Sequence, residues 1–416
     1  FSLDVNHRSA IETRQGRRAL HYVASAHPTL VVDEVTTNAL LPILREEIAA
    51  SNGQITLARF MELALYHPEF GYYLSEERKP GRGGDFLTSP EASPLFGITL
   101  AQQINECWER LDRPDPFVIR EYGSGIGGLA YDILAGLATD HPACFAATSY
   151  HLAERNRHRQ ADALTAFRDV GLIDKIVDES DSGLDVITGV ILANEVADAF
   201  PAHRLVRTDG IWSEEWVVVA DDGFAFANGA VSAEGAHAVA QIEVGLTTVP
   251  DGIYDLAPGA ATWFGEAIAR LERGYAIVID YGYPAPELYS RHRLGGTLRA
   301  YRDHAVSDDP FADPGNTDLT AHVDFSALRR SGEEQGAVLA GLTTQGAFLS
   351  SLNLGQRLLE MQTSGDTTMQ EYLAAQAVVL RLIDPGGLGR FRILLMARNA
   401  PIEPPLLGLA VSPPPF

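Results

Sequence analysis

The stretch FVIREYGSGIGGLAYD, residues Phe117 to Asp132, decides the fold of this chain. Its apolar first half predicts a strand that ends in an acid, Glu121, and its second half predicts a helix. Between them lies a glycine turn with Gly123, Gly125 and Gly127. Glycine permits positive φ and lets a ligand approach the backbone closely. Because the following helix also offers free N–H groups, the stretch predicts a site for a nucleotide-type cofactor.

Two cofactor classes fit this turn. Gly123, Gly125 and Gly128 satisfy the G-x-G-x-x-G spacing of dinucleotide-binding folds. The E-x-G-x-G-x-G pattern that begins at Glu121 instead resembles the first motif of class I S-adenosylmethionine (SAM) methyltransferases. A carboxylate there suits a cofactor with an ammonium and a sulfonium, and it repels a pyrophosphate. A second strand is predicted to end at Glu154, which can accept ribose hydroxyls from either cofactor, so an NAD-dependent oxidoreductase stays an alternative here.

Apolar strands alternate with helices after this stretch. A third strand is expected near Lys175 to Asp178, a nearly all-apolar fourth over Val186 to Ala193, and a fifth over Tyr275 to Asp280. A late pair of strands includes Arg390 to Arg398. This alternation predicts an α/β fold with a doubly wound, mostly parallel Rossmann-like sheet.

Other patterns divide the chain further. Alternating apolar and polar residues around two Asp-Gly turns predict a small antiparallel β meander that begins at His203 and is inserted into the α/β domain. The expected organisation is an N-terminal extension (1–36), an N-terminal helical region with a cofactor-facing loop (37–115), the α/β domain (116–400) with its insertion (203–250) and a helical region (320–385), and a proline-rich tail (401–416) that is expected to be disordered.

Composition narrows the function. The 416 residues are 46% hydrophobic and 21% charged, which is typical of a globular protein. With 55 acidic and 32 basic residues, and a net charge of -23, the chain lacks the basic face that nucleic acid binding requires. No apolar run is long enough to predict membrane insertion. The two cysteines, Cys107 and Cys144, form no metal-binding pattern or disulfide framework and are consistent with a reducing compartment.

Five motifs in order resemble one family. They are GDFLTSPEASPLFG (84–97), EYGSGIGGLAYD (121–132), ANEVADAFPAHRL (193–205), DLTAHVDFSAL (318–328) and TTQGAFLSSLNL (343–354). Together they are similar to the MidA-type SAM-dependent methyltransferases, a family that includes the mitochondrial complex I assembly factor that methylates an arginine of a complex I subunit. The resemblance implies the class I methyltransferase fold, SAM as cofactor and a protein arginine as acceptor. It leaves open a complex I subunit as substrate, a homodimer, and a location in the bacterial cytoplasm or the mitochondrial matrix.

The resemblance also implies site residues. Thr88, Ser89 and Pro90 belong to the cofactor-facing loop, and the hydroxyls of Thr88 and Ser89 suit the methionine carboxylate; a plain helix-entry turn is the alternative. Asn194 joins the cofactor residues named above. Glu195 and Asp198, after the fourth strand, are expected to hold the guanidinium, unless Asp198 only caps a helix.

Further candidates lie beyond the fourth strand. His322 with Asp324 forms a candidate base–orienter pair, and Tyr281 is a candidate for the wall of the methyl pocket. The first motif departs from the family pattern E-L-G-P-G-R-G at Tyr122, Ser124 and Ile126. This departure keeps open a second function, a SAM-binding assembly chaperone without transfer activity.

Overall fold

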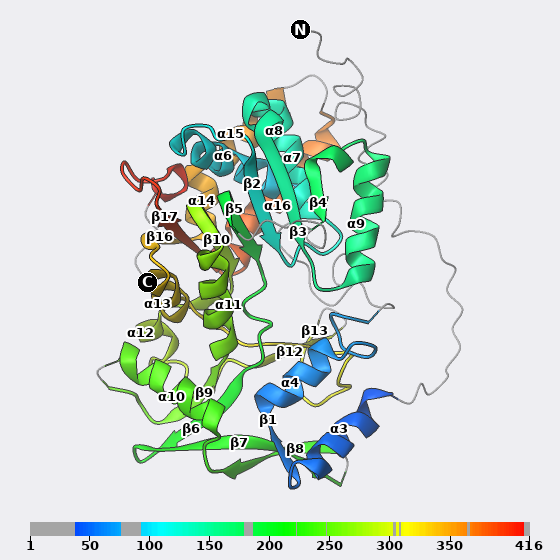
Figure 1. Cartoon of the computed structure of the whole chain (residues 1–416), viewed down its shortest axis with the longest axis vertical. Helices are drawn as coiled ribbons and strands as arrows, with labels where there is room; N and C mark the ends of the chain where they lie inside the picture. The colour runs from blue at the N-terminus through cyan, green and yellow to red at the C-terminus, as the bar shows by residue number, and fades with distance from the viewer. Residues whose placement is uncertain are drawn as a thin grey trace.

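The computed structural model describes residues 38–75, 93–178, 186–221, 223–246, 248–302, 305–307, 309–363 and 367–411. Its centre is a seven-stranded sheet in the order β16-β17-β10-β5-β2-β3-β4 (Figure 1). The bounds of its strands are β2 Phe117–Tyr122, β3 Thr148–Ala153, β4 Ile176–Asp178, β5 Ile187–Asn194, β10 Leu271–Asp280, β16 Val338–Thr344 and β17 Arg392–Arg398. The predicted mostly parallel α/β sheet is confirmed.

The direction of the strands places the site. β4, β3, β2, β5 and β10 are parallel, and β17 pairs antiparallel with both β10 and β16. The chain leaves β2 toward β3 and β4, and then crosses back to β5 on the other side of β2. In open α/β sheets, ligands bind at the carboxyl ends of the strands where the order reverses. That switch point lies between β2 and β5.

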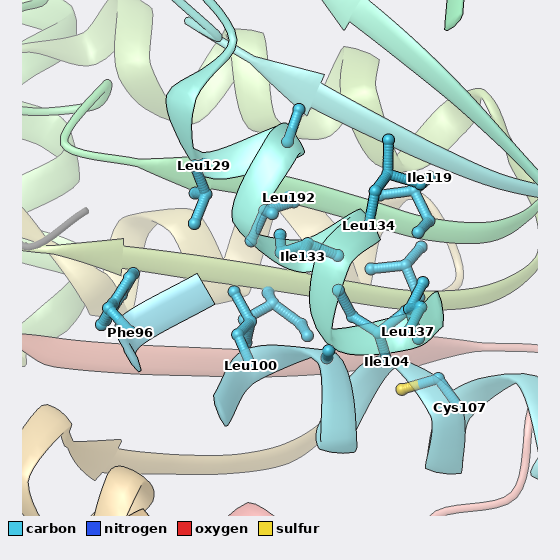
Figure 2. Close-up of a cluster of buried hydrophobic side chains, with 14 of the residues drawn as sticks. Phe96, Leu100, Ile104, Cys107, Ile119, Leu129, Ile133, Leu134, Leu137 and Leu192 are labelled. Carbon is cyan, nitrogen blue, oxygen red and sulfur yellow. The ribbon is translucent and has the colours of Figure 1, made fainter. Parts of the chain in front are cut away.

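Helices cover both faces of the sheet, which explains its apolar strands. Successive residues of a strand point to opposite faces, so Ile119 and Leu192 join one buried cluster, and Val118 and Ile191 join another. On the first face, Leu129, Ile133, Leu134 and Leu137 of α7 pack against Phe96, Leu100 and Ile104 of α6 (Figure 2). On the second face, α11 and α13 contribute Phe264 and Leu328.

The predicted helix after Thr56 is confirmed. Thr56 accepts a hydrogen bond from the backbone N–H of Arg59 and caps α4, as expected. The helices are α3 Leu40–Ala50, α4 Leu57–Tyr66, α6 Pro94–Arg110, α7 Gly128–Asp140, α8 Pro142–Ala147, α9 Arg157–Asp169, α10 Ala233–Gly245, α11 Pro258–Ala269, α12 Ala285–Leu288, α13 Phe325–Glu334, α14 Gln345–Ser351, α15 Leu354–Thr363 and α16 Met369–Ile383, with short 3₁₀ turns at Ile173–Lys175, Leu388–Arg390 and Leu407–Leu409. In the part of the chain that the structure describes, none of them is long and apolar enough to cross a membrane.

The predicted meander forms a second sheet in the lower part of Figure 1. β6 (His203–Thr208), β7 (Ile211–Ala220) and β8 (Gly223–Gly229) are antiparallel, as expected. Two strands that were not predicted extend this sheet: β9 (Gly252–Leu256) pairs with β6, and β1 (Gln54–Thr56) pairs with β7. Smaller ladders join β11 Gly282–Tyr283 to β15 Val323–Asp324, and β12 Arg299–Arg302 to β13 Ala305–Ser307 and β14 Asp318–Thr320.

The region predicted as one N-terminal unit is divided between two cores. Ile48 of α3 and Phe60 of α4 pack with Val217 of the second sheet, whereas Phe96 of α6 belongs to the core of the central sheet. α6 is therefore part of the α/β domain, and α3 and α4 belong with the inserted sheet.

The predicted late pair of strands is confirmed, because β16 is the antiparallel partner of β17. The rest of the region 320–385 is mostly helical, as expected, with α13, α14, α15 and α16. The expected disorder of the tail is wrong. The tail is ordered over 401–411: Leu406 is buried, and the N–H of Leu407 donates to Glu106 Oε2 at 2.8 Å. These contacts, together with the bond from the N–H of Gly408 to Gln103 Oε1 at 2.9 Å, hold the segment on α6.

Candidate active site

The glycine turn connects β2 to α7 at the switch point, as the sequence predicts. Gly125 has φ +55°, and a Cβ there would meet no atom of the described residues within 4 Å, so these residues leave this side of the turn open. Gly127 has φ +81° and is the N-cap of α7, and a Cβ on it would lie 2.6 Å from the Phe167 ring. Gly123 donates its N–H to the Ala153 carbonyl at 3.0 Å. Gly125 therefore gives a ligand access, and Gly123 and Gly127 shape the turn.

Glu121 lies buried beneath this turn. Its Oε2 accepts the hydroxyl hydrogen of Tyr150, from the next strand, at 2.7 Å. Burial raises the pKa of Glu121 to about 8, the Tyr150 hydrogen bond opposes this rise, and the charge of Glu154 adds to it. In the absence of a cation, the side chain is therefore mostly protonated at neutral pH.

Glu154 follows β3 and reaches the same turn. Its Oε2 accepts the N–H of Gly125 at 2.8 Å, and its Oε1 accepts the N–H of Asn156 at 2.7 Å. Each oxygen keeps a second lone pair. Glu154, which the sequence assigns to the ribose hydroxyls, is therefore fixed beside Gly125. Its two oxygens can each accept one more hydrogen bond.

Asn156, which the sequence analysis missed, connects this edge to the N-terminal region. Its Oδ1 caps α9, and its Nδ2 donates to the Tyr73 carbonyl at 2.8 Å. A cap residue two positions after a strand-end acid is the sequence signal that would have found it. Thr88, Ser89 and Pro90 of the predicted cofactor-facing loop lie outside the described residues.

Asn194 and Glu195 stand at the carboxyl end of β5, next to β2. Asn194 Nδ2 donates to Glu195 Oε1 at 3.1 Å, and no described residue donates to the buried Asn194 Oδ1. Glu195 has φ +53°, which is uncommon for a residue with a side chain. Its N–H donates to the Ile279 carbonyl of β10 at 2.9 Å. The neighbouring strand therefore holds this backbone in an unusual conformation, as is frequent in functional sites.

Asp280, at the end of β10, organises the loop that follows Glu195. Its fully buried Oδ2 accepts N–H groups from Val196, Ala197 and Asp198 at 3.1, 2.8 and 3.4 Å. Its Oδ1 accepts the N–H of Tyr281 at 2.7 Å. Burial raises the pKa of Asp280 to about 6, and the backbone N–H groups oppose that rise. The sequence analysis missed this residue, although the rule that singled out acids at the ends of β2 and β3 also applies to β10.

Asp198 lies among other acids. Burial raises its pKa well above the usual range, and the charges of Asp280, Asp318 and Glu195 raise it further. Asp318, from β14, accepts the Tyr73 hydroxyl hydrogen at 2.7 Å. No helix begins after Asp198, because the chain turns and enters β6, so the helix-cap alternative is wrong. Asp318 lies inside a motif that was recognised, and only the fold shows that it joins this group.

The predicted His322–Asp324 pair is wrong. Asp324 Oδ1 accepts the N–H groups of Ser326 and Ala327 and caps α13, and its Oδ2 accepts the Tyr289 hydroxyl hydrogen. The His322 ring lies 4.0 Å from the Tyr281 ring, centroid to centroid. Burial lowers the pKa of His322 to about 3, and three arginines lower it further. Both ring nitrogens of His322 are buried and have no hydrogen-bond partner among the described residues, so no carboxylate orients the ring. The role of His322 as a base stays a prediction.

Two of the three substituted positions of the first motif, Ser124 and Ile126, have different surroundings. Ser124 is buried, and its Oγ has no hydrogen-bond partner among the described residues. Ile126 is 47% exposed, so it leaves the turn open where the family pattern has arginine.

The described residues suit a cationic cofactor that carries hydroxyls. Glu154 contacts Gly125, Glu121 lies buried at the end of β2, and Asn194 offers an Oδ1 without a partner among the described residues at the end of the neighbouring strand β5. A pyrophosphate would meet like charge here, whereas an ammonium or sulfonium is favoured. Within the described residues, no group of three or more His, Cys, Asp or Glu side chains could hold a metal ion. The fold and this crevice define a class I SAM-dependent methyltransferase.

Comparison with known proteins agrees. Residues 99–343 match a family model described as "Putative S-adenosyl-L-methionine-dependent methyltransferase", and the chain belongs to this family. The "Protein arginine methyltransferase NDUFAF7 homolog, mitochondrial" of Drosophila melanogaster is 30% identical over 83% of this chain and 82% of its own length. Its human counterpart is 31% identical over 78% of this chain and 76% of its own length.

A solved structure supports the cofactor. A "likely methyl transferase" from Burkholderia thailandensis, bound to S-adenosyl-homocysteine, is 33% identical, with a TM-score of 0.80 over 92% of this chain and 98% of its own. The cofactor is therefore SAM, and the dinucleotide alternative is set aside.

Proposed function

We propose that this methyltransferase transfers the methyl group of SAM to an arginine of a protein substrate. The observation that carries the proposal is the group of acids beside the cofactor turn: Glu195 and Asp198 from one loop, with Asp318 near Asp198. A guanidinium is cationic and must approach a second cation, so it needs carboxylates at this point. Two relatives named as protein arginine methyltransferases support the same substrate class.

Each residue has a role in this proposal. SAM supplies an activated methyl group when bound. Glu154, which the Gly125 N–H holds in place, would accept the ribose hydroxyls, while Glu195 and Asp198 would hold the guanidinium by charge-assisted hydrogen bonds. Asp280 keeps Asp198 in place through the backbone of the loop. The attacking nitrogen forms its bond to the methyl carbon while the carbon–sulfur bond breaks, and one of the two carboxylates takes the N–H proton.

The wider role rests on the resemblance alone. A complex I subunit is the candidate protein substrate, and a homodimer is the candidate assembly. For a eukaryotic source we expect the mitochondrial matrix, because the two relatives named above are described as mitochondrial. For a bacterial source we expect the cytoplasm.

The test is a transfer assay with SAM carrying a labelled methyl group. The probe is a set of synthetic peptides with one arginine and varied flanking residues, followed by hydrolysis and identification of the labelled amino acid. Labelled methylarginine is expected. Label on another residue contradicts the proposed acceptor. SAM binding without any transfer supports the chaperone alternative, which the substituted positions Ser124 and Ile126 favour.

SAM binding should release a proton from Glu121. The pKa of this carboxyl is about 8 in the described state, and a nearby cation lowers it by favouring the carboxylate. Affinity should therefore rise with pH up to about 8, by at most about tenfold per pH unit, and then level off as the unbound protein also loses this proton. Calorimetry in buffers of different ionisation enthalpy measures the released protons. Glu121→Gln should remove the release, and an unchanged release in that variant would contradict the assignment.

Gly125→Val should block the cofactor. The side chain would extend into the open side of the turn, and its backbone strain at φ +55° costs about 1–3 kcal/mol. SAM affinity should fall on the order of 100-fold, equivalent to about 3 kcal/mol. Gly336→Val is a matched control, because Gly336 also has positive φ and open surroundings but lies in the turn between α13 and β16. Equal loss of SAM affinity in both variants would show that strain, not obstruction, is responsible.

A further inference from the structure

Four arginines lie around three aromatic rings, beside the acidic group formed by Glu195, Asp198 and Asp318, here termed the acidic crevice. They are Arg293, Arg299, Arg390 and Arg392, here termed the basic row. The guanidinium carbons of Arg390 and Arg293 lie 4.8 and 3.8 Å from the ring centres of Tyr281 and Tyr283, respectively. The His322 ring lies between the tyrosines, 4.0 Å from the ring of Tyr281 and 5.6 Å from that of Tyr283. The rings fix the directions of side chains that would otherwise be flexible.

The basic row is short of counter-ions. Glu287 pairs with Arg392 at 3.0 Å and lies 3.9 Å from Arg293. Arg299 and Arg390 are exposed and have no carboxylate partner among the described residues. Arg299 donates to the Leu298 carbonyl, and Arg390 donates to the Tyr281 hydroxyl at 2.8 Å. Arg299 and Arg390 therefore keep their charge available to a ligand, in a chain with 55 acidic and 32 basic residues.

A single backbone segment joins the basic row to the acidic crevice. The N–H of Ala321 donates to the Asp198 carbonyl, and the N–H of Val323 donates to the Tyr281 carbonyl, both at 3.0 Å. His322 stands between these two bonds, and Tyr281 directly follows Asp280. The two oppositely charged surfaces are therefore neighbours at the carboxyl ends of β5 and β10.

The positive charges of the basic row act on the nearby His322 ring and lower its pKa. Burial lowers its pKa most, and Arg299, Arg293 and Arg390 each lower it further. Three positive charges thus act on the same ring, and two of them, on Arg299 and Arg390, have no carboxylate partner among the described residues. A carboxylate that entered here would gain charge-assisted hydrogen bonds to guanidinium groups that are already oriented.

We propose that the basic row binds an acidic residue of the substrate protein that lies next to the target arginine in space. The inference rests on the proposed arginine acceptor and specifies it: the arginine enters the acidic crevice while its acidic neighbour pairs with Arg299 and Arg390. The basic row also offsets the repulsion that a protein of net charge -23 exerts on an acidic segment.

The test measures peptide binding separately from methyl transfer. The probes are three fluorescent peptides with one arginine, flanked by three aspartates, three asparagines or three lysines. Anisotropy is recorded with S-adenosyl-homocysteine present. The aspartate peptide should bind about tenfold more tightly than the asparagine peptide, which corresponds to about 1.4 kcal/mol. The preference should weaken as salt is added.

Variants of the basic row decide the assignment. Arg299→Gln combined with Arg390→Gln should remove the aspartate preference and leave SAM binding unchanged. Arg168→Gln combined with Arg381→Gln is the matched control, since these exposed arginines have no ion pair among the described residues and lie on α9 and α16. Arg390→Glu should shift the preference toward the lysine peptide.

Two outcomes would overturn the proposal: equal binding of the aspartate and asparagine peptides by the unaltered protein, or an aspartate preference that survives loss of Arg299 and Arg390. The proposed acceptor fails separately. If the aspartate preference depends on the basic row but no peptide arginine is methylated, the acid-binding surface stands and arginine is the wrong acceptor.

Discussion

Glu195→Gln is expected to lower kcat for methyl transfer at least about 100-fold while SAM binds with nearly unchanged affinity. Glutamine keeps the size of the side chain and the acceptor for Asn194 Nδ2, but it removes the charge that holds a guanidinium beside the cationic cofactor. The contact between a neutral amide and a cationic acceptor is weaker, and the two cations then repel one another. Single-turnover transfer with saturating SAM, together with a separate SAM titration, measures the two effects.

Glu272→Gln is the control for this experiment. Glu272 is exposed at the start of β10, whereas the site lies at the carboxyl end of this strand. The substitution therefore removes a charge without any change at the site. It should transfer methyl groups at the unaltered rate. Loss of transfer and SAM binding together in Glu195→Gln would place Glu195 with the cofactor and contradict its role in holding the acceptor.

Asp280→Asn is expected to cost stability and activity together. The Asp280 carboxylate is fully buried and accepts four backbone N–H groups, three of them from the loop that carries Asp198. In an asparagine, one of the two accepting oxygens becomes an NH₂ donor that faces backbone N–H groups. The unpaired donors should cost about 2–3 kcal/mol of the free energy of unfolding. The loop should lose its conformation, with a fall in kcat of about 100-fold.

Urea denaturation and transfer by the folded fraction separate the two effects. Asp255→Asn is the matched control, because Asp255 is buried and accepts the N–H groups of Thr297 and Leu298 away from the cofactor turn. It should lose comparable stability but keep its kcat. If Asp280→Asn kept full transfer activity, the loop would not depend on this carboxylate.

The sequence alone determined the part of the fold that is local along the chain. The run from Phe117 to Asp132 specified strand, turn and helix, because apolar residues, glycines and helix formers follow one another without a gap. The predicted strand ends also placed Glu121, Glu154 and Glu195 at the carboxyl ends of neighbouring parallel strands, where the structure has them. Their roles in binding and transfer stay predictions. The five motifs identified the family, and the comparisons confirm it.

Only the tertiary structure decided the relations between distant segments. Asp280 contacts Val196 across 84 positions, and no local pattern encodes such a bond. The sequence predicted a partner for the late strand β17, but only the fold shows that this partner is β16. His322 and Asp324 are close in sequence, yet Asp324 caps a helix while His322 packs between aromatic rings. Backbone hydrogen bonds and burial determine side-chain partners, and both depend on residues that the chain brings together only when it folds.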